Sequence, residues 1–150
     1  MICKRSVAIL ALALSLVLVP AISAQPNQPL RCEVSITLDW GPPVQWDGEI
    51  TGDIEGTFII RADPAPSFPG ETEHFFETWV IETLDGTIEL YQEGVWSFKT
   101  FKWKSNGRVT FASGEWVYLI GSNVHVRGTT TPLTADPVTG LGTLTISINK

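Results

Sequence analysis

Apolar and polar residues alternate one by one along most of this chain, and this pattern constrains the fold more than any other feature. Alternation with period two is typical of β-strands that bury one face. No stretch carries the helical repeat of apolar residues, so the pattern predicts an all-β protein. The clearest strand is expected at 31–38, where the apolar positions are Cys32, Val34, Ile36 and Leu38.

Turn signals divide the alternation into eight or nine short antiparallel strands. The pattern predicts one long strand over residues 49–61 and a shorter one over 116–120. Asp85-Gly86 predicts a two-residue hairpin turn, and Asn106-Gly107 predicts a second hairpin with a three-residue turn.

Glycines and bulges indicate how these strands are arranged. Gly52 and Gly56 fall on the apolar face of the long strand, where glycine normally weakens a sheet. We also expect β-bulges near Lys99 and at Ser113-Gly114. Inward-facing glycines and bulges curl a sheet until its edges meet. The sequence therefore predicts a single closed antiparallel barrel of eight to nine strands, with a β-sandwich as the alternative.

The N-terminal segment has the three parts of a secretory signal peptide. Lys4 and Arg5 precede an apolar run at 7–19, and small residues ending at Ala24 follow it. A membrane anchor is the alternative, but thirteen apolar residues are too few to cross a hydrocarbon core about 30 Å thick. The expected divisions are a cleaved signal peptide at 1–24, a flexible lead-in at 25–30 and a barrel domain at 31–150.

Cleavage after Ala24 predicts a secreted or periplasmic chain of 126 residues without a membrane span. It removes two of the 10 basic residues and none of the 16 acidic ones, which leaves a formal charge of −8. We expect no nucleic-acid partner, because a polyphosphate requires a basic surface. Cys32 is left without a second cysteine, so stability must come from packing.

The hairpin around Asp85-Gly86 carries the first candidate site. Its predicted register pairs Ile81 with Leu90 and Trp79 with Gln92, which creates one apolar face. Glu77 shares that face. The predicted ligand contacts on this hairpin are Phe75, Trp79, Ile81, Ile88, Leu90 and Gln92.

Glu77 is the candidate catalytic residue. A carboxylate on an apolar, tryptophan-lined surface has its charged form disfavoured, so its pKa rises toward values useful in acid–base chemistry. The same side chain could anchor a ligand hydroxyl. The alternative is that Glu77 lies in water near the strand end or pairs with Arg61.

Tyr118, His125 and Arg127 form the second candidate site. A two-residue turn at Ser122-Asn123 would place Tyr118 opposite Arg127, and an inward-pointing face could then bind an anionic head group. Hydrophobic cost favours the opposite arrangement, with these polar residues outside. The face that would then point inward carries Val117, Leu119, Val126 and Gly128.

No metal or cofactor is expected. The chain has only 2 histidines, with no H-x-H or C-x-x-C spacing. It also lacks a G-x-S-x-G motif, a phosphate loop and a dinucleotide fingerprint. A basic run from Lys99 to Arg108, interleaved with aromatics, could bind an anionic surface but is more typical of a lysine-protected strand edge.

Three glycine-rich strings carry a family resemblance: 48–58 (GEITGDIEGTF), 107–114 (GRVTFASG) and 140–146 (GLGTLTI). They resemble the small eight-stranded barrels of the allene oxide cyclase and dirigent group. The resemblance implies a secreted or organellar barrel whose hydrophobic lumen holds a lipid-like or phenolic substrate. No catalytic residue of that group is carried over to a position in this chain.

Three functions are consistent with the sequence. The first is a secreted barrel that binds a small apolar or amphipathic molecule in its lumen, with Glu77 as a polar anchor. The second is a cyclase or isomerase, in which confinement of the substrate lowers the barrier and Glu77 moves a proton. The third is a sealed barrel without enzymatic activity that works through its outer surface, for example as a homo-oligomer. A lumen below about 300 Å³ would exclude a drug-sized ligand and favour the third.

Overall fold

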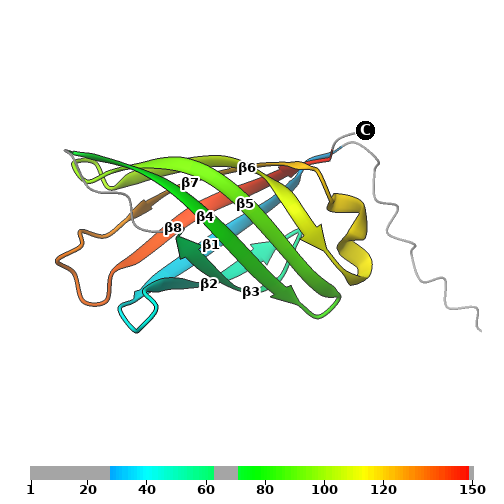
Figure 1. The fold of residues 1–150 in the computed structure, drawn as a ribbon, viewed down its shortest axis with the longest axis horizontal. Coiled ribbons are helices and arrows are strands. Elements are labelled where there is room, and N and C mark those ends of the chain that lie inside the picture. The colour runs from blue at the N-terminus through cyan, green and yellow to red at the C-terminus, as the bar shows by residue number, and fades with distance from the viewer. Residues whose placement is uncertain (1–27, 63–70, 149–150) are drawn as a thin grey trace, which may run out of the picture.

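The computed structural model describes residues 28–62 and 71–148 and confirms the closed barrel. Each strand pairs antiparallel with the next, and the last pairs with the first, as Figure 1 shows. Eight strands form the ring, so the upper count of nine is wrong. They are β1 (Leu30–Asp39), β2 (Gln45–Gly52), β3 (Gly56–Ala62), β4 (Thr72–Thr83), β5 (Gly86–Ser97), β6 (Lys102–Ala112), β7 (Asn123–Thr130) and β8 (Thr139–Ser147).

The described part of the chain starts at residue 28, close to the beginning of the barrel. The predicted signal peptide at 1–24 lies outside the described residues, as do the first residues of the predicted lead-in. The barrel itself begins at Leu30. Across 28–62 and 71–148, no helix has the length and apolar character needed to cross a membrane.

The period-two pattern determines which side chains enter the barrel. Cys32, Val34 and Ile36 of β1 are all buried, and Leu144 and Ile146 of β8 are fully buried. The residues between them along each strand are more exposed. One face of every strand therefore supplies the core, as alternation predicts.

The predicted long strand at 49–61 is wrong. It is a hairpin in which β2 and β3 pair with each other, and Ile50 lies opposite Gly56. Gly52 adopts a positive φ of 116° where the chain leaves β2, a conformation that glycine adopts without a steric penalty. The alternation continues through the turn because Ile54, in the loop, is also buried. The pattern alone therefore did not reveal the turn.

The predicted hairpin at Asn106-Gly107 is also wrong. Both residues lie inside β6, opposite Glu93 and Gln92 of β5. Gly107 is required there because a Cβ would lie within 2.6 Å of the Gln92 Cβ and still closer to a backbone oxygen. The glycine permits two strands to approach closely, so it does not mark a turn.

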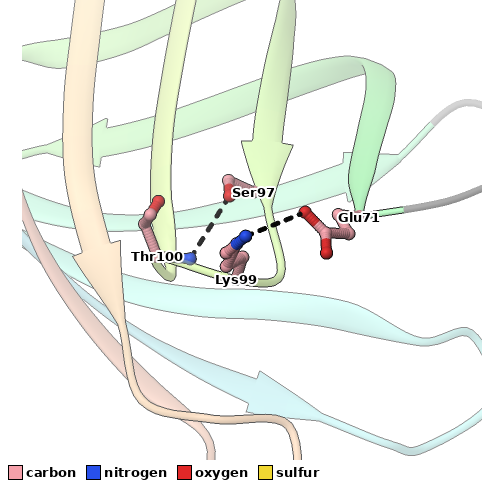
Figure 2. A network of polar contacts seen from close by, with 4 residues as sticks. All are labelled: Glu71, Ser97, Lys99 and Thr100. Carbon is pink, nitrogen blue, oxygen red and sulfur yellow. Dashed lines mark hydrogen bonds and ion pairs between the residues drawn. The ribbon is translucent and has the colours of Figure 1, made fainter.

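The turn between β5 and β6 lies at 98–101 instead. Phe101 ends it with a positive φ of 56°, which is unusual for a residue other than glycine. Figure 2 shows the polar contacts around this turn: Ser97 Oγ accepts a hydrogen bond from the Thr100 N–H at 3.3 Å, and Lys99 Nζ lies 3.7 Å from Glu71 Oε2. The bulge expected near Lys99 is therefore this turn. The register shift in the β5–β6 pair occurs between Glu89 and Leu90.

The hairpin of β4 and β5 has the expected faces but a different register. Thr83 pairs with Gly86, so the two-residue turn is Leu84-Asp85 rather than Asp85-Gly86. The pairing is thereby displaced by two residues relative to the prediction, and Trp79 faces Leu90. A displacement of two keeps every side chain on the same face of the sheet.

Residues 116–120 do not form the expected strand. The segment Gly114–Leu119 is a short 3-10 helix, η1, which lies at one end of the barrel in Figure 1. Leu119 is fully buried, and Trp116 Nε1 donates a hydrogen bond to Thr83 Oγ1 at 2.8 Å. The predicted bulge at Ser113-Gly114 is the start of this helix. We call the half of the barrel that η1 covers the closed half.

The other half, which we call the open half, ends at the β1–β2 and β7–β8 loops. Several of its strands carry a glycine opposite a large inward side chain. Gly94 lies beneath Phe75, while Gly128 and Gly142 lie beneath Trp103. A Cβ at Gly128 would stand only 2.6 Å from the Trp103 ring. These glycines leave room for aromatic rings to lie flat against the wall.

Candidate functional site

A cavity of about 300 Å³ occupies the open half of the barrel. Five tryptophans line it, from four strands and the β1–β2 loop: Trp40, Trp46, Trp79, Trp96 and Trp103. Two carboxylic acids, Glu73 and Glu77, stand among them on β4. The remaining lining residues are Ile36, Leu38, Val44, Ile60, Ala62, Phe75, Thr130 and Leu133.

Stacked rings close the inner end of this cavity. Trp79 is fully buried and stacks on Phe58, with ring centroids 4.6 Å apart and planes 11° from parallel. Trp103 tilts against Trp79 at 6.3 Å. Trp46 and Trp96, which also line the cavity, meet edge to face with their ring centroids 5.9 Å apart. The cavity is therefore bounded by rigid planar side chains that fill space in few conformations.

Glu77 enters the cavity from the middle of β4. It pairs with Ala62 of β3 on one side and with Gln92 of β5 on the other. Its Oε1 accepts a hydrogen bond from Trp79 Nε1 at 2.7 Å, which holds the carboxyl group against the cavity's inner end. Arg61 is exposed and forms no ion pair with it. The alternative of a charge-neutralising arginine is therefore wrong for this residue.

The surroundings of Glu77 disfavour its ionised form. Burial raises the pKa of this carboxyl from its ordinary value of 4.5 to about 7, against the opposing effect of the Trp79 hydrogen bond. The negative charge of Glu73 adds a smaller upward contribution. Burial also raises the pKa of Glu73 itself. Near neutral pH, Glu77 is thus able either to donate or to accept a proton.

Several buried polar atoms beside the cavity have no hydrogen-bond partner among the described residues. They include the indole nitrogens of Trp96 and Trp103 and the hydroxyl of Thr130. Gln92 is satisfied only in part, since its Oε1 accepts from Ser105 Oγ at 2.8 Å while its Nε2 is unpaired. Buried polar atoms are usually paired, so this concentration marks the region as more than packed core.

The structure brings together part of the first predicted site. Phe75, Glu77 and Trp79 line the cavity as the sequence predicts. Ile81, Ile88 and Leu90 share their face but are fully buried in the packed interior and do not line the cavity. Gln92 is also buried, directly opposite Glu77 rather than diagonal to it.

The second predicted site does not form in the lumen. His125 and Arg127 lie on the outer face of β7, and Val124 and Val126 take the inner positions. His125 Nδ1 lies 2.7 Å from Asn106 Oδ1 of the neighbouring strand. Tyr118 belongs to η1 and is exposed. The hydrophobic cost of burying these polar groups decided their placement.

Sequence reasoning missed most of the tryptophans and the second acid. Glu73 and Glu77 are both odd-numbered residues of β4 and therefore lie on the same face of the strand, so the alternation could have revealed Glu73. Trp46 shares the even-numbered face of β2 with Ile50 and could have been found in the same way. Trp96 and Trp103 face each other across β5 and β6, a pairing hidden by the wrongly placed turn.

The comparisons with known proteins add no relative. No protein-family model, no curated protein and no solved structure matches this chain. The resemblance to the allene oxide cyclase and dirigent group therefore stays a prediction. Across the described residues, no three His, Cys, Asp or Glu side chains come together as a metal site.

Proposed function

We propose that this barrel binds a small amphipathic molecule in the cavity of its open half. The observation that carries the proposal is an apolar cavity with the carboxyl group of Glu77 held in its wall. Ligand sites are commonly apolar hollows in which a few polar groups orient the ligand. The tryptophan rings would contact the apolar part, and Glu77 would contact the polar group.

The cavity volume limits the size of the ligand. A cavity of roughly 150 Å³ holds benzene, and drug-sized ligands need at least about 300 Å³. The observed 300 Å³ therefore suits a compact molecule with two or three rings, or a short chain. Exposed Trp40, Val44 and Leu133 around the mouth would contact any part that extends outward. From the N-terminal segment, we propose that binding takes place outside the cytoplasm.

A fluorescent probe tests this proposal. The uncharged dye N-phenyl-1-naphthylamine should brighten when it enters the cavity. Ala62→Trp places an indole in the lining and should lower the dye's affinity at least tenfold. Leu141→Trp adds the same ring to the exposed outer face of β8 and is the matched control. Equal dye binding by the wild type and Ala62→Trp would contradict the proposal.

A second candidate function is a cyclase or isomerase that uses the same cavity. The pKa of Glu77, raised to about 7 by burial, favours it because proton transfer is most efficient when the pKa lies near the working pH. Confinement between rigid rings would restrict a flexible substrate to reactive conformations.

Native mass spectrometry of protein purified from its own source can separate binding from catalysis. It would identify a retained molecule, which is then incubated with the wild type and with Glu77→Gln. A catalyst should lose turnover in the variant while affinity changes only a few-fold. Undiminished turnover would eliminate Glu77 as the proton carrier.

A further inference from the structure

The cavity has a marked imbalance of charge. Its lining contains the carboxyl groups of Glu73 and Glu77 and, within the described residues, no lysine, arginine or histidine. The basic side chains of the adjacent strands point the other way: Arg61, Lys104 and Arg127 are exposed on the outer surface. A half-buried acid without a protein cation leaves its ionised form uncompensated.

The aromatic lining, like the two carboxyl groups, favours positive charge in the cavity. The face of an indole ring is electron-rich, and tryptophan binds cations more strongly than phenylalanine or tyrosine does. Five of the chain's 6 tryptophans line this cavity. Aromatic cages of this composition bind quaternary ammonium groups and other organic cations.

The two acids are spaced along the cavity. Glu73 and Glu77 are four residues apart on the same face of β4, which separates their Cα atoms by roughly 13 Å. Glu77 lies at the inner end beside Trp79, and Glu73 lies nearer the mouth, opposite Trp96. A positively charged group therefore meets a carboxyl group on entry and another at the inner end.

We propose that the cavity selects an amphipathic organic cation, with an ammonium group held by Glu77 and the tryptophan rings. This inference rests on the proposed function and specifies its ligand class. An anion of the same size would meet two acids and several electron-rich ring faces. A neutral molecule would leave the ionised acid uncompensated.

Cation binding is coupled to the ionisation of Glu77. Because burial raises the pKa of this carboxyl to about 7, the empty site is largely protonated below that pH. A cation favours the ionised form, so its affinity should rise between pH 5.5 and pH 8. Glu73 is the other titratable group in the described lining, and Ala62, Trp79 and Gln92 are the uncharged neighbours of Glu77.

Three ligands of nearly equal shape test this selection by calorimetry at pH 8. They are phenyltrimethylammonium, its uncharged carbon counterpart tert-butylbenzene, and the anion benzenesulfonate. We expect the cation to bind at least tenfold more tightly than tert-butylbenzene, with benzenesulfonate the weakest. If tert-butylbenzene binds as tightly as the cation, the inference is overturned and the proposed function stands. If none of the three binds, both are overturned.

Variants then locate the selectivity. Glu77→Gln keeps the shape of the side chain and should reduce the ratio of cation affinity to tert-butylbenzene affinity at least fivefold. Glu93→Gln removes a carboxylate from the exposed outer face of β5 and is the control for net charge. An equal drop in both variants would show a general charge effect and overturn the assignment.

The wild-type protein supplies a test that does not depend on a variant folding. Its affinity for phenyltrimethylammonium should rise about tenfold from pH 5.5 to pH 8, while that for tert-butylbenzene should not rise, because an uncharged ligand does not compensate the ionised acid. A cation affinity independent of pH over this range would overturn the role of Glu77.

Discussion

The two halves of this barrel are built from the same alternating strands, yet one is filled and the other is hollow. In the closed half the interior consists largely of branched aliphatic side chains, including Ile50, Ile81, Ile88 and Ile146. In the open half, large rings lie over glycines and surround the cavity. Aliphatic side chains interdigitate to high density, whereas rigid rings pressed against the wall leave the axis unoccupied.

The difference also separates the packed core from the proposed binding site. The closed half has the fully buried Leu119 of η1 as a cover and keeps little space for a guest. The open half holds the unpaired polar atoms of Trp96, Trp103 and Thr130 and the acid with the most perturbed pKa. A folded protein tolerates such features where function requires them, provided that the remaining core compensates.

Truncation of the core should show the largest difference between the halves. Ile88→Ala removes fully buried atoms from the filled half. It should lower the free energy of unfolding by about 3–4 kcal/mol, because it creates a new cavity. Leu38→Ala only enlarges an existing cavity and should cost about 1–2 kcal/mol. Urea unfolding measures both. Equal losses would show that the two halves are packed alike.

The next largest effect should be a pH-dependent loss of stability centred on Glu77. The folded pKa of about 7 exceeds the ordinary 4.5, so this group's contribution is complete below about pH 4.5 and is lost as the pH rises through 7. Glu77→Gln lacks this titrating group. As the pH rises from 5 to 8, its free energy of unfolding should therefore increase by about 2–3 kcal/mol relative to that of the wild type. Urea midpoints at the two pH values measure the gain. The same gain in Glu93→Gln would refute its origin in the cavity.

The smallest effects concern the polar contacts at the two ends. Trp116→Phe removes the 2.8 Å hydrogen bond to Thr83 at the closed end and should cost about 1 kcal/mol. Lys99→Ala removes the ion pair with Glu71 at the open end, shown in Figure 2, and should cost less than about 0.5 kcal/mol because both side chains are largely exposed. Thermal unfolding compares them. A larger loss at Lys99 would reverse the ranking of the ends.

The faces of the strands could be predicted from the sequence, because alternation is a local property. Trp79, Ile81, Ile88 and Leu90 are buried as expected, although their predicted register was displaced by two residues. An even displacement preserves the faces, so the error does not affect burial. For the same reason Glu77 was predicted on the correct side of its strand.

The β5–β6 turn could not be predicted, because Asn106-Gly107, a pair of residues that usually marks a turn, lies inside β6. Gly107 allows β5 and β6 to approach each other, although Asn-Gly is a common turn sequence. The real turn ends at Phe101, whose positive φ has no sequence signal. The cavity was equally hidden, because its walls come from strands distant in sequence, and the pairing of Trp96 with Trp103 depends on that turn.

Closure of the ring also limits how this molecule can meet other copies of itself. Every strand has a hydrogen-bonded neighbour on both sides over at least part of its length, so within the described residues no strand leaves one whole edge unpaired. Lys102 and Lys104 therefore do not shield an edge, contrary to the interpretation favoured by the sequence. The outer wall therefore presents mainly side chains to another copy, such as the exposed Leu141.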